Sequence, residues 1–190
     1  MPFPLSHSSG APVPQLAAVM PTPFSRIGVS TLDGYISHIA FLPTDHPLQS
    51  PRNALAEKCC TQIERYAQDP DTRFDLPLLI QGSLYRRRIW AAIVAIPRGQ
   101  TRTYGDIAKD IRSIPRAVGQ ACGDNPFPLV IPCHRVVTTV SIGGFAHNRN
   151  GFLIDIKRWL LIHEGNADPL GEIQRNLFET PPNLPGQPTA

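Results

Sequence analysis

The chain has 190 residues and a mass of 20.9 kDa, enough for one domain of ordinary size or two small ones. Its 42% hydrophobic and 17% charged residues indicate a folded protein, and no apolar run approaches the roughly 20 residues needed to span a bilayer. These values exclude an integral membrane protein. Prolines interrupt the first twenty residues where a signal peptide needs an apolar stretch, so we expect a cytoplasmic protein.

The positive charge is concentrated in one segment. Residues 83–165 carry 12 basic and 5 acidic residues, whereas residues 1–82 carry 5 and 7 and residues 166–190 carry 1 and 3. Such a concentration has two interpretations. Either it binds a polyanion such as nucleic acid by neutralising phosphates, or it is a solvated basic face.

The first part of the sequence predicts two flanking tails and a small sheet with one helix. Proline-rich ends predict disordered tails over residues 1–21 and 166–190. The β-rich runs 27–29 and 35–41 flank Asp33-Gly34, a dipeptide that favours a tight hairpin turn. Apolar residues at helical spacing then predict an amphipathic helix over 54–67. We expect an N-terminal α/β domain over residues 22–82.

A second helix is expected to begin at Ser83 and to stop at Pro97-Arg98-Gly99. Its spacing predicts that Leu84, Ile89, Trp90 and Ile93 face a core. This helix opens a second domain, residues 83–165.

Two short helices follow it. Thr103 and Asp106 form a capping box for the first, and Pro115 suits the first turn of the second. Two helices joined by about four residues in a basic segment fit either a helix-turn-helix or two packed helices of a bundle.

One cysteine stands in an unusual setting. Three prolines between Asn125 and Cys133 hold the chain in a defined path, and His134 and Arg135 follow directly. An electropositive neighbourhood favours thiolate over thiol, so Cys133 is either a reactive cysteine or a buried structural one. Adjacent side chains diverge, so His134 would reach the thiol more simply through a water, and an acid such as Glu164 is a candidate to orient the imidazole.

The other cysteines and histidines give no ligand set. The four cysteines lack the paired C-x-x-C spacing of a zinc site, and the histidines are scattered. We therefore expect no metal and no cofactor.

Four motifs together resemble one family, the O6-alkylguanine-DNA alkyltransferases. The run Ile131-Pro-Cys-His-Arg-Val136 is similar to the family's active-site motif. Its flanking motifs are Arg116-Ala-Val-Gly119, Asn125-Pro126 and Ile156-Lys-Arg-Trp-Leu-Leu-Ile-His-Glu-Gly165. The resemblance implies an α/β fold, with a small N-terminal sheet-and-helix domain followed by a mostly helical catalytic domain that contains a helix-turn-helix.

The resemblance also implies the activity. It predicts irreversible transfer of the alkyl group from O6-methylguanine in double-stranded DNA to the protein's own cysteine after the nucleotide is flipped out of the helix, and it leaves open whether O4-methylthymine is also a substrate. Because nothing in the sequence suggests a means of cleaving the thioether product, we expect one turnover per molecule. We also expect a monomer.

The site residues implied by the resemblance fall into three groups. The catalytic group comprises the nucleophile Cys133, the water-linked base His134, its partner Glu164, the turn-stabilising Asn125 and the proton donor Tyr104. The DNA-binding group comprises Arg116, which would replace the flipped nucleotide, Ala117, Thr103 and Gly119. The substrate-pocket group comprises Val136, Phe145 and Lys157.

The sequence departs from the family pattern beside the pocket. Phe145, after Gly143-Gly144, stands where the family often has tyrosine, and the stretch Ala146–Asp155 is several residues longer than usual. This loop is expected to wall the pocket, so it bears on which alkyl groups larger than methyl are accepted.

Three other functions compete with alkyl transfer. A damage-binding module would recognise the lesion without removing it, but such relatives replace the nucleophile and Cys133 is present here. A helix-turn-helix regulator would need long polar side chains on its second helix, where Ala117, Val118 and Gly119 are small or apolar. A cysteine hydrolase would need an oxyanion site, and none is evident.

Overall fold

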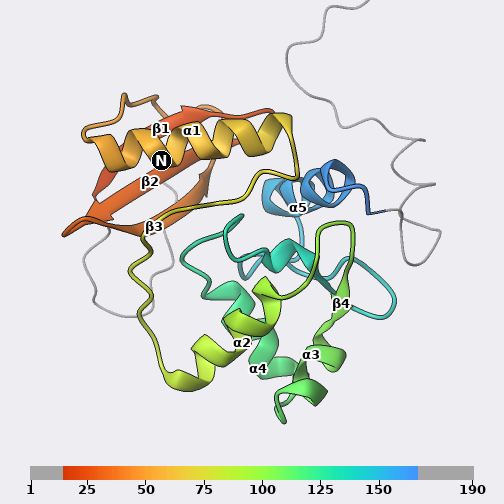
Figure 1. Cartoon of the computed structure of the whole chain (residues 1–190). Helices are drawn as coiled ribbons and strands as arrows, with labels where there is room; N and C mark the ends of the chain where they lie inside the picture. The colour runs from red at the N-terminus through yellow and green to blue at the C-terminus, as the bar shows by residue number, and fades with distance from the viewer. Residues whose placement is uncertain (1–14, 167–190) are drawn as a thin grey trace, which may run out of the picture.

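An antiparallel sheet of three strands forms the first part of the molecule (Figure 1). The computed structural model describes residues 15–166, and the strands are β1 (Leu16–Pro21), β2 (Arg26–Leu32) and β3 (Tyr35–Leu42). Between β2 and β3, Asp33 and Gly34 both have positive φ, 49° and 80°. Two consecutive residues with a left-handed backbone conformation form a turn whose twist matches that of the two flanking strands. The predicted hairpin is therefore confirmed.

The expected N-terminal tail is wrong at its inner end. Residues 16–21 form β1, which pairs with β2, and Ala17, Ala18 and Val19 are buried. Burial of these apolar side chains beneath helix α1 (Ala54–Gln68) stabilises the strand, and this outweighs the disordering effect of the nearby prolines. Residues 1–14 and 167–190 lie outside the described residues, so the rest of both predicted tails is untested.

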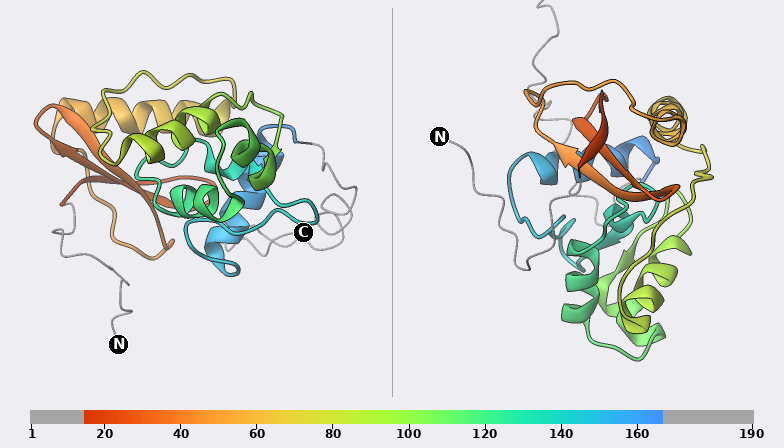
Figure 2. Two further views of the ribbon diagram at one scale, coloured as in Figure 1. Left: turned by 90° about the horizontal axis from the view of Figure 1, so that it is seen from below. Right: turned by 90° about the vertical axis from the view of Figure 1, so that its left-hand side faces the viewer.

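Helix α1 (Ala54–Gln68) packs on one face of this sheet (Figure 2). The side chain of Asn53 accepts a hydrogen bond of 2.8 Å from the backbone of Ala56 and so caps the helix. Its buried residues recur at helical spacing: Ala56, Cys59, Ile63 and Tyr66. The predicted helix is therefore confirmed.

The outer edge of β3 receives two segments from elsewhere in the chain. Ile36 donates to the carbonyl of Pro77 at 2.8 Å and accepts from Leu79 at 2.9 Å. Ile39 donates to the carbonyl of Pro126 at 2.8 Å. The sheet edge thus holds both the connection to helix α2 (Leu84–Val94) and the segment that leads to Cys133.

The second part of the molecule is mostly helical. It contains α2 (Leu84–Val94), α3 (Tyr104–Asp110), α4 (Pro115–Gly123) and α5 (Phe152–His163). A short parallel pair, β4 (Arg102–Thr103) and β5 (Val136–Val137), and the 3₁₀ turn η1 (Cys133–Arg135) lie among them. Helices α3 and α4 pack together as the helix-turn-helix.

The predicted start signals of these helices hold. The Thr103 hydroxyl accepts from the backbone of Asp106, the Asp106 carboxylate accepts from the backbone of Thr103, and Pro115 is the first residue of α4. The expectation for Leu84 is wrong, because its side chain is 80% exposed. The first turn of α2 extends past the core, and burial begins at Ile89.

One continuous set of buried side chains joins the two parts, with Ile36 and Tyr66 from the first and Phe127 and Leu160 from the second. The expected domain boundary near residue 82 stays a prediction. Within residues 15–166 no helix is long and apolar enough to cross a membrane. Over the same residues, no group of three His, Cys, Asp or Glu side chains is placed to hold a metal ion.

Candidate active site

Cys133 begins η1 and is held by the side chain of Asn125. The Asn125 amide donates to the carbonyl of Ile131 at 2.8 Å and to Sγ of Cys133 at 3.2 Å, and its oxygen accepts from the backbone of Phe127 at 2.9 Å. One amide therefore closes the proline-rich turn and also contacts the thiol. Asn125 was expected to stabilise the turn, but sequence reasoning did not find the contact with sulfur.

His134, the residue that follows Cys133, forms a buried pair with Glu164. Nε2 of His134 lies 2.9 Å from Oε1 of Glu164, and both residues are 0% exposed. Nδ1 of His134 has no hydrogen-bond partner among residues 15–166. Burial lowers the pKa of His134, although Glu164 acts in the opposite direction. The imidazole is therefore neutral at pH 7 and able to accept a proton.

Two further side chains hold the Glu164 carboxylate. Arg135 donates from Nε to Oε2 at 2.7 Å and from Nη2 to Oε1 at 2.8 Å, and the Tyr66 hydroxyl donates to Oε1 at 2.8 Å. Burial alone would raise the pKa of Glu164, but its hydrogen bonds with His134 and Arg135 outweigh burial and hold that pKa well below its ordinary value. The carboxylate therefore stays ionised. Sequence reasoning missed both Arg135 and Tyr66 as its partners.

Tyr104 and Lys157 meet at one backbone carbonyl. The Tyr104 hydroxyl donates to the carbonyl of Gly144 at 3.3 Å, and Nζ of Lys157 donates to the same oxygen at 2.9 Å and to the carbonyl of Val136 at 2.7 Å. Burial raises the pKa of Tyr104, so its hydroxyl keeps its proton. Burial also lowers the pKa of Lys157 to about 8.

The Cys133 thiol itself is nearly buried, at 4% exposure. Burial raises the pKa of Cys133, whereas the Asn125 hydrogen bond and the Lys157 charge lower it. The site therefore holds Cys133 as a thiol at neutral pH. A base is needed to ionise it.

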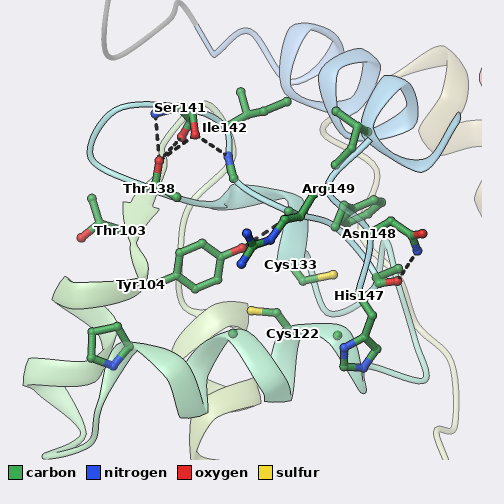
Figure 3. Close-up of a pocket in the computed structure, with 18 of the residues that line it drawn as sticks. Thr103, Tyr104, Cys122, Cys133, Thr138, Ser141, Ile142, His147, Asn148 and Arg149 are labelled. Carbon is green, nitrogen blue, oxygen red and sulfur yellow. Dashed lines mark hydrogen bonds between the residues drawn. The ribbon is translucent and has the colours of Figure 1, made fainter. Parts of the chain in front are cut away.

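A cavity of about 980 Å³ opens beside Cys133 (Figure 3). Tyr104, Cys122 and Phe145 also line this cavity. Of the three residues assigned to the pocket by resemblance, Phe145 lines this cavity, whereas Val136 and Lys157 are fully buried behind it. Cys122 is an additional lining residue that the sequence did not single out.

The residues expected to bind DNA lie on or beside the helix-turn-helix. Arg116 is exposed at the second position of α4, and Ala117 follows it half-buried. Thr103 and Gly119 both line the cavity, and Gly119 lies close to the ring of Tyr104. The structure thus brings the two groups of predicted residues to adjacent sites.

Comparison with known proteins identifies relatives of this arrangement. Residues 84–166 match the family model described as the DNA-binding domain of 6-O-methylguanine DNA methyltransferase. A methylated-DNA–protein-cysteine methyltransferase of Methanosarcina mazei is 34% identical over 139 residues, which cover 69% of this chain and 85% of that protein. The protein of the same name from Archaeoglobus fulgidus is 44% identical over 84 residues, which cover 44% of this chain and 57% of that protein.

Solved structures agree with the sequence matches. The crystal structure of Mycobacterium tuberculosis O6-methylguanine methyltransferase has a TM-score of 0.66 and 26% identity, and the match covers 82% of this chain and 96% of that one. The same organism's OGT in complex with DNA has a TM-score of 0.65 and 29% identity, with 80% and 93% covered. This chain therefore belongs to the methylated-DNA–protein-cysteine methyltransferase family.

Proposed function

We propose that this protein repairs DNA by transferring the alkyl group of O6-methylguanine to its own Cys133. The observation that supports this most is a thiol that lines a cavity and is followed directly by a buried His134 paired with Glu164. The names of the relatives point to the same reaction. Double-stranded DNA is the partner.

The target base must leave the duplex before it can react. Guanine O6 is buried in the base pair, and flipping a nucleotide costs on the order of a few kcal/mol. Arg116 is exposed near the start of α4 and fills the space that the flipped base leaves. Ala117 and Gly119 are small enough for α4 to approach the DNA closely, and Thr103 lines the same cavity as Gly119.

The thiol loses its proton to His134 through a bridging water. A neutral imidazole is needed for this step, and the lowered pKa of His134 supplies it. Once the imidazole is protonated, the ionised Glu164 stabilises its charge at 2.9 Å. The Asn125 amide, 3.2 Å from Sγ, stabilises the thiolate.

The thiolate then attacks the alkyl carbon. The S–C bond forms as the C–O6 bond breaks, and the electron pair of that bond goes to guanine O6. Tyr104 donates a hydrogen bond to the departing base, and its raised pKa keeps the hydroxyl protonated for this role. The base finally takes up one proton, which balances the proton that the thiol gave to His134. Lys157 remains on the Gly144 carbonyl when the Tyr104 hydroxyl turns to the base, so that oxygen keeps a partner. Phe145 lines the pocket for the alkyl group, and Val136 and Lys157 support the wall from behind.

The product is a thioether, which explains a single turnover for each molecule. The reaction needs no cofactor and no metal. We also propose that the protein acts as a monomer in the cytoplasm.

The experiment that tests this function counts repaired lesions. The protein is mixed with a tenfold excess of duplex containing O6-methylguanine, and restored guanine is measured over time. We expect repair to stop at one lesion per molecule and Cys133→Ala to bind the duplex without repair. Tight lesion binding without repair by the natural chain would instead assign the protein to the damage-binding class.

A further inference from the structure

The loop between Phe145 and α5, residues 146–151, forms a tight turn at the mouth of the cavity. Phe145 and Asn148 exchange two backbone hydrogen bonds of 2.8 Å each. The two residues between them, Ala146 and His147, have positive φ of 46° and 63°. Residues other than glycine rarely adopt this backbone conformation, so contacts with the rest of the protein must hold the turn in place.

His147 anchors this turn to the end of α4. Its ring lies against the backbone of Gly123, where a Cβ atom would overlap the ring. Nε2 of His147 lies 2.8 Å from Oδ1 of Asp124, and Oδ2 of Asp124 accepts from Arg86 at 2.7 Å. The turn is therefore fixed to the helix-turn-helix before any substrate arrives.

The anchored turn directs Arg149 into the cavity. Figure 3 shows the Arg149 side chain running back from the loop toward Tyr104, and Cγ of Arg149 packs near Gly144. Arg149 forms no hydrogen bond or ion pair with any residue in the described part of the chain. The second arginine of the lining, Arg158, is paired with Asp155 at 3.1 Å.

The lining of the cavity is positively charged. Among the described residues, it includes Arg149 and Arg158 but no aspartate or glutamate. A guanidinium without an acidic partner at the edge of such a cavity is a binding group for an anion. Its planar fork matches a carboxylate, which can accept two parallel hydrogen bonds.

We propose that Arg149 is a specificity-determining residue that binds O6-alkyl groups ending in a carboxylate. This inference rests on the proposed function and names a substrate class for the same site. The reacting bonds are unchanged: the S–C bond forms at the carbon attached to O6, the C–O6 bond breaks, and the electron pair goes to O6. The carboxylate stays on the transferred group and ends on the cysteine. A DNA phosphate is the less favoured anion, because Arg149 points inward toward Tyr104.

The test compares two lesions in the same duplex. Single-turnover rates are measured for O6-carboxymethylguanine and O6-methylguanine with the natural chain, Arg149→Gln and Arg149→Lys. We expect Arg149→Gln to lower the ratio of carboxymethyl to methyl rates by about tenfold, since a charge-assisted hydrogen bond is lost. Arg149→Lys keeps the charge without the fork and should fall between the two. Arg149 is exposed, so neither change affects folding.

Arg158→Gln is the matched control, since it removes the same charge from the same lining where the arginine is already paired. It should leave the ratio of the two rates unchanged. An unchanged ratio in Arg149→Gln would overturn the proposal, whether both rates stay constant or both fall equally. An equal fall, with a weaker salt dependence of DNA binding, would assign Arg149 to a phosphate. If the natural chain transfers neither group, the proposed function fails as well.

Discussion

The hydroxyl of Tyr66 donates a hydrogen bond of 2.8 Å to Glu164, and so connects α1 with the residue that ends α5. The two residues are 98 positions apart, and both are buried. The same carboxylate accepts from Arg135 and lies beside His134. The N-terminal part of the molecule therefore contributes directly to holding the candidate base.

Tyr66→Phe tests this connection. Removal of the hydroxyl leaves a buried carboxylate with one donor fewer, so the free energy of unfolding should fall by about 1 to 2 kcal/mol. Urea denaturation measures it. Tyr85→Phe is the control, because the Tyr85 hydroxyl contacts Ser113 at an exposed position and its loss should change stability little. If both changes lower the free energy of unfolding equally, the hydrogen bond to Glu164 contributes no more to stability than an exposed one.

Glu164→Gln should destabilise the protein by about 3 kcal/mol at pH 7, because Arg135 loses its buried counter-charge. The pKa of Glu164 is lowered in the folded state, so its contribution is fully present above the ordinary value of 4.5 and is lost as the pH falls below it. The difference in stability between the natural chain and the variant should therefore shrink in acid. Glu57→Gln, at an exposed position on α1, should show no such difference. A difference in free energy of unfolding between the natural chain and Glu164→Gln that stays constant down to pH 3 would contradict a lowered pKa of Glu164.

The rate of alkyl transfer should have an acid limb at unusually low pH. Burial lowers the pKa of His134 from its ordinary 6.5, so the imidazole stays neutral until the pH falls below that value. Single-turnover rates on O6-methylguanine DNA should thus fall to half of their plateau only at a pH below 6.5. A half-maximal rate at or above pH 6.5 would mean that His134 is not the base or is not desolvated.

Gly123→Ala should have opposite effects in two backgrounds. In the natural chain the added Cβ would displace the His147 ring and destabilise the protein. In a His147→Ala background the same change should be neutral or stabilising by up to about 1 kcal/mol, because alanine favours a helix over glycine. Thermal unfolding of the four proteins measures both effects. Destabilisation of equal size in both backgrounds would show that the ring does not rest on Gly123.

Arg116→Ala should slow transfer from duplex DNA by at least about tenfold, because the flipped state loses its support. Transfer from the free base O6-methylguanine needs no flipping and should be unaffected. The two rates are compared in single-turnover assays. Equal losses of rate on both substrates would show that Arg116 acts in the alkyl-transfer step and not in nucleotide flipping.

Local signals in the sequence predicted much of this fold. The Asp33-Gly34 turn, the Thr103–Asp106 capping box and Pro115 at the start of α4 all act within a few residues of their own position. Strand β1 was missed because its gain comes from packing beneath a helix more than thirty residues away. Leu84 was misplaced because helical spacing shows which residues share a face but not where the core ends.

The sequence predicted which residues form the candidate site, but it did not predict the contacts between them. Cys133, His134 and Asn125 lie in one short run with a strong motif, so the sequence pointed to them. The partners Tyr66 and Arg135 could not be found, since only the tertiary fold brings them to Glu164. The longer loop before α5 was noticed, but the place of Arg149 depends on the docking of His147 against Gly123.

The mass of the intact protein, measured after mixing with duplex DNA that carries O6-methylguanine, tests the central claim most directly. Alkyl transfer predicts a single gain of about 14 Da, one methylene equivalent, which peptide mapping assigns to Cys133 as a thioether. Cys122, the second thiol of the cavity, should stay unmodified. An unchanged mass despite lesion binding, or a methyl group found on Cys122 with Cys133 free, would contradict the account.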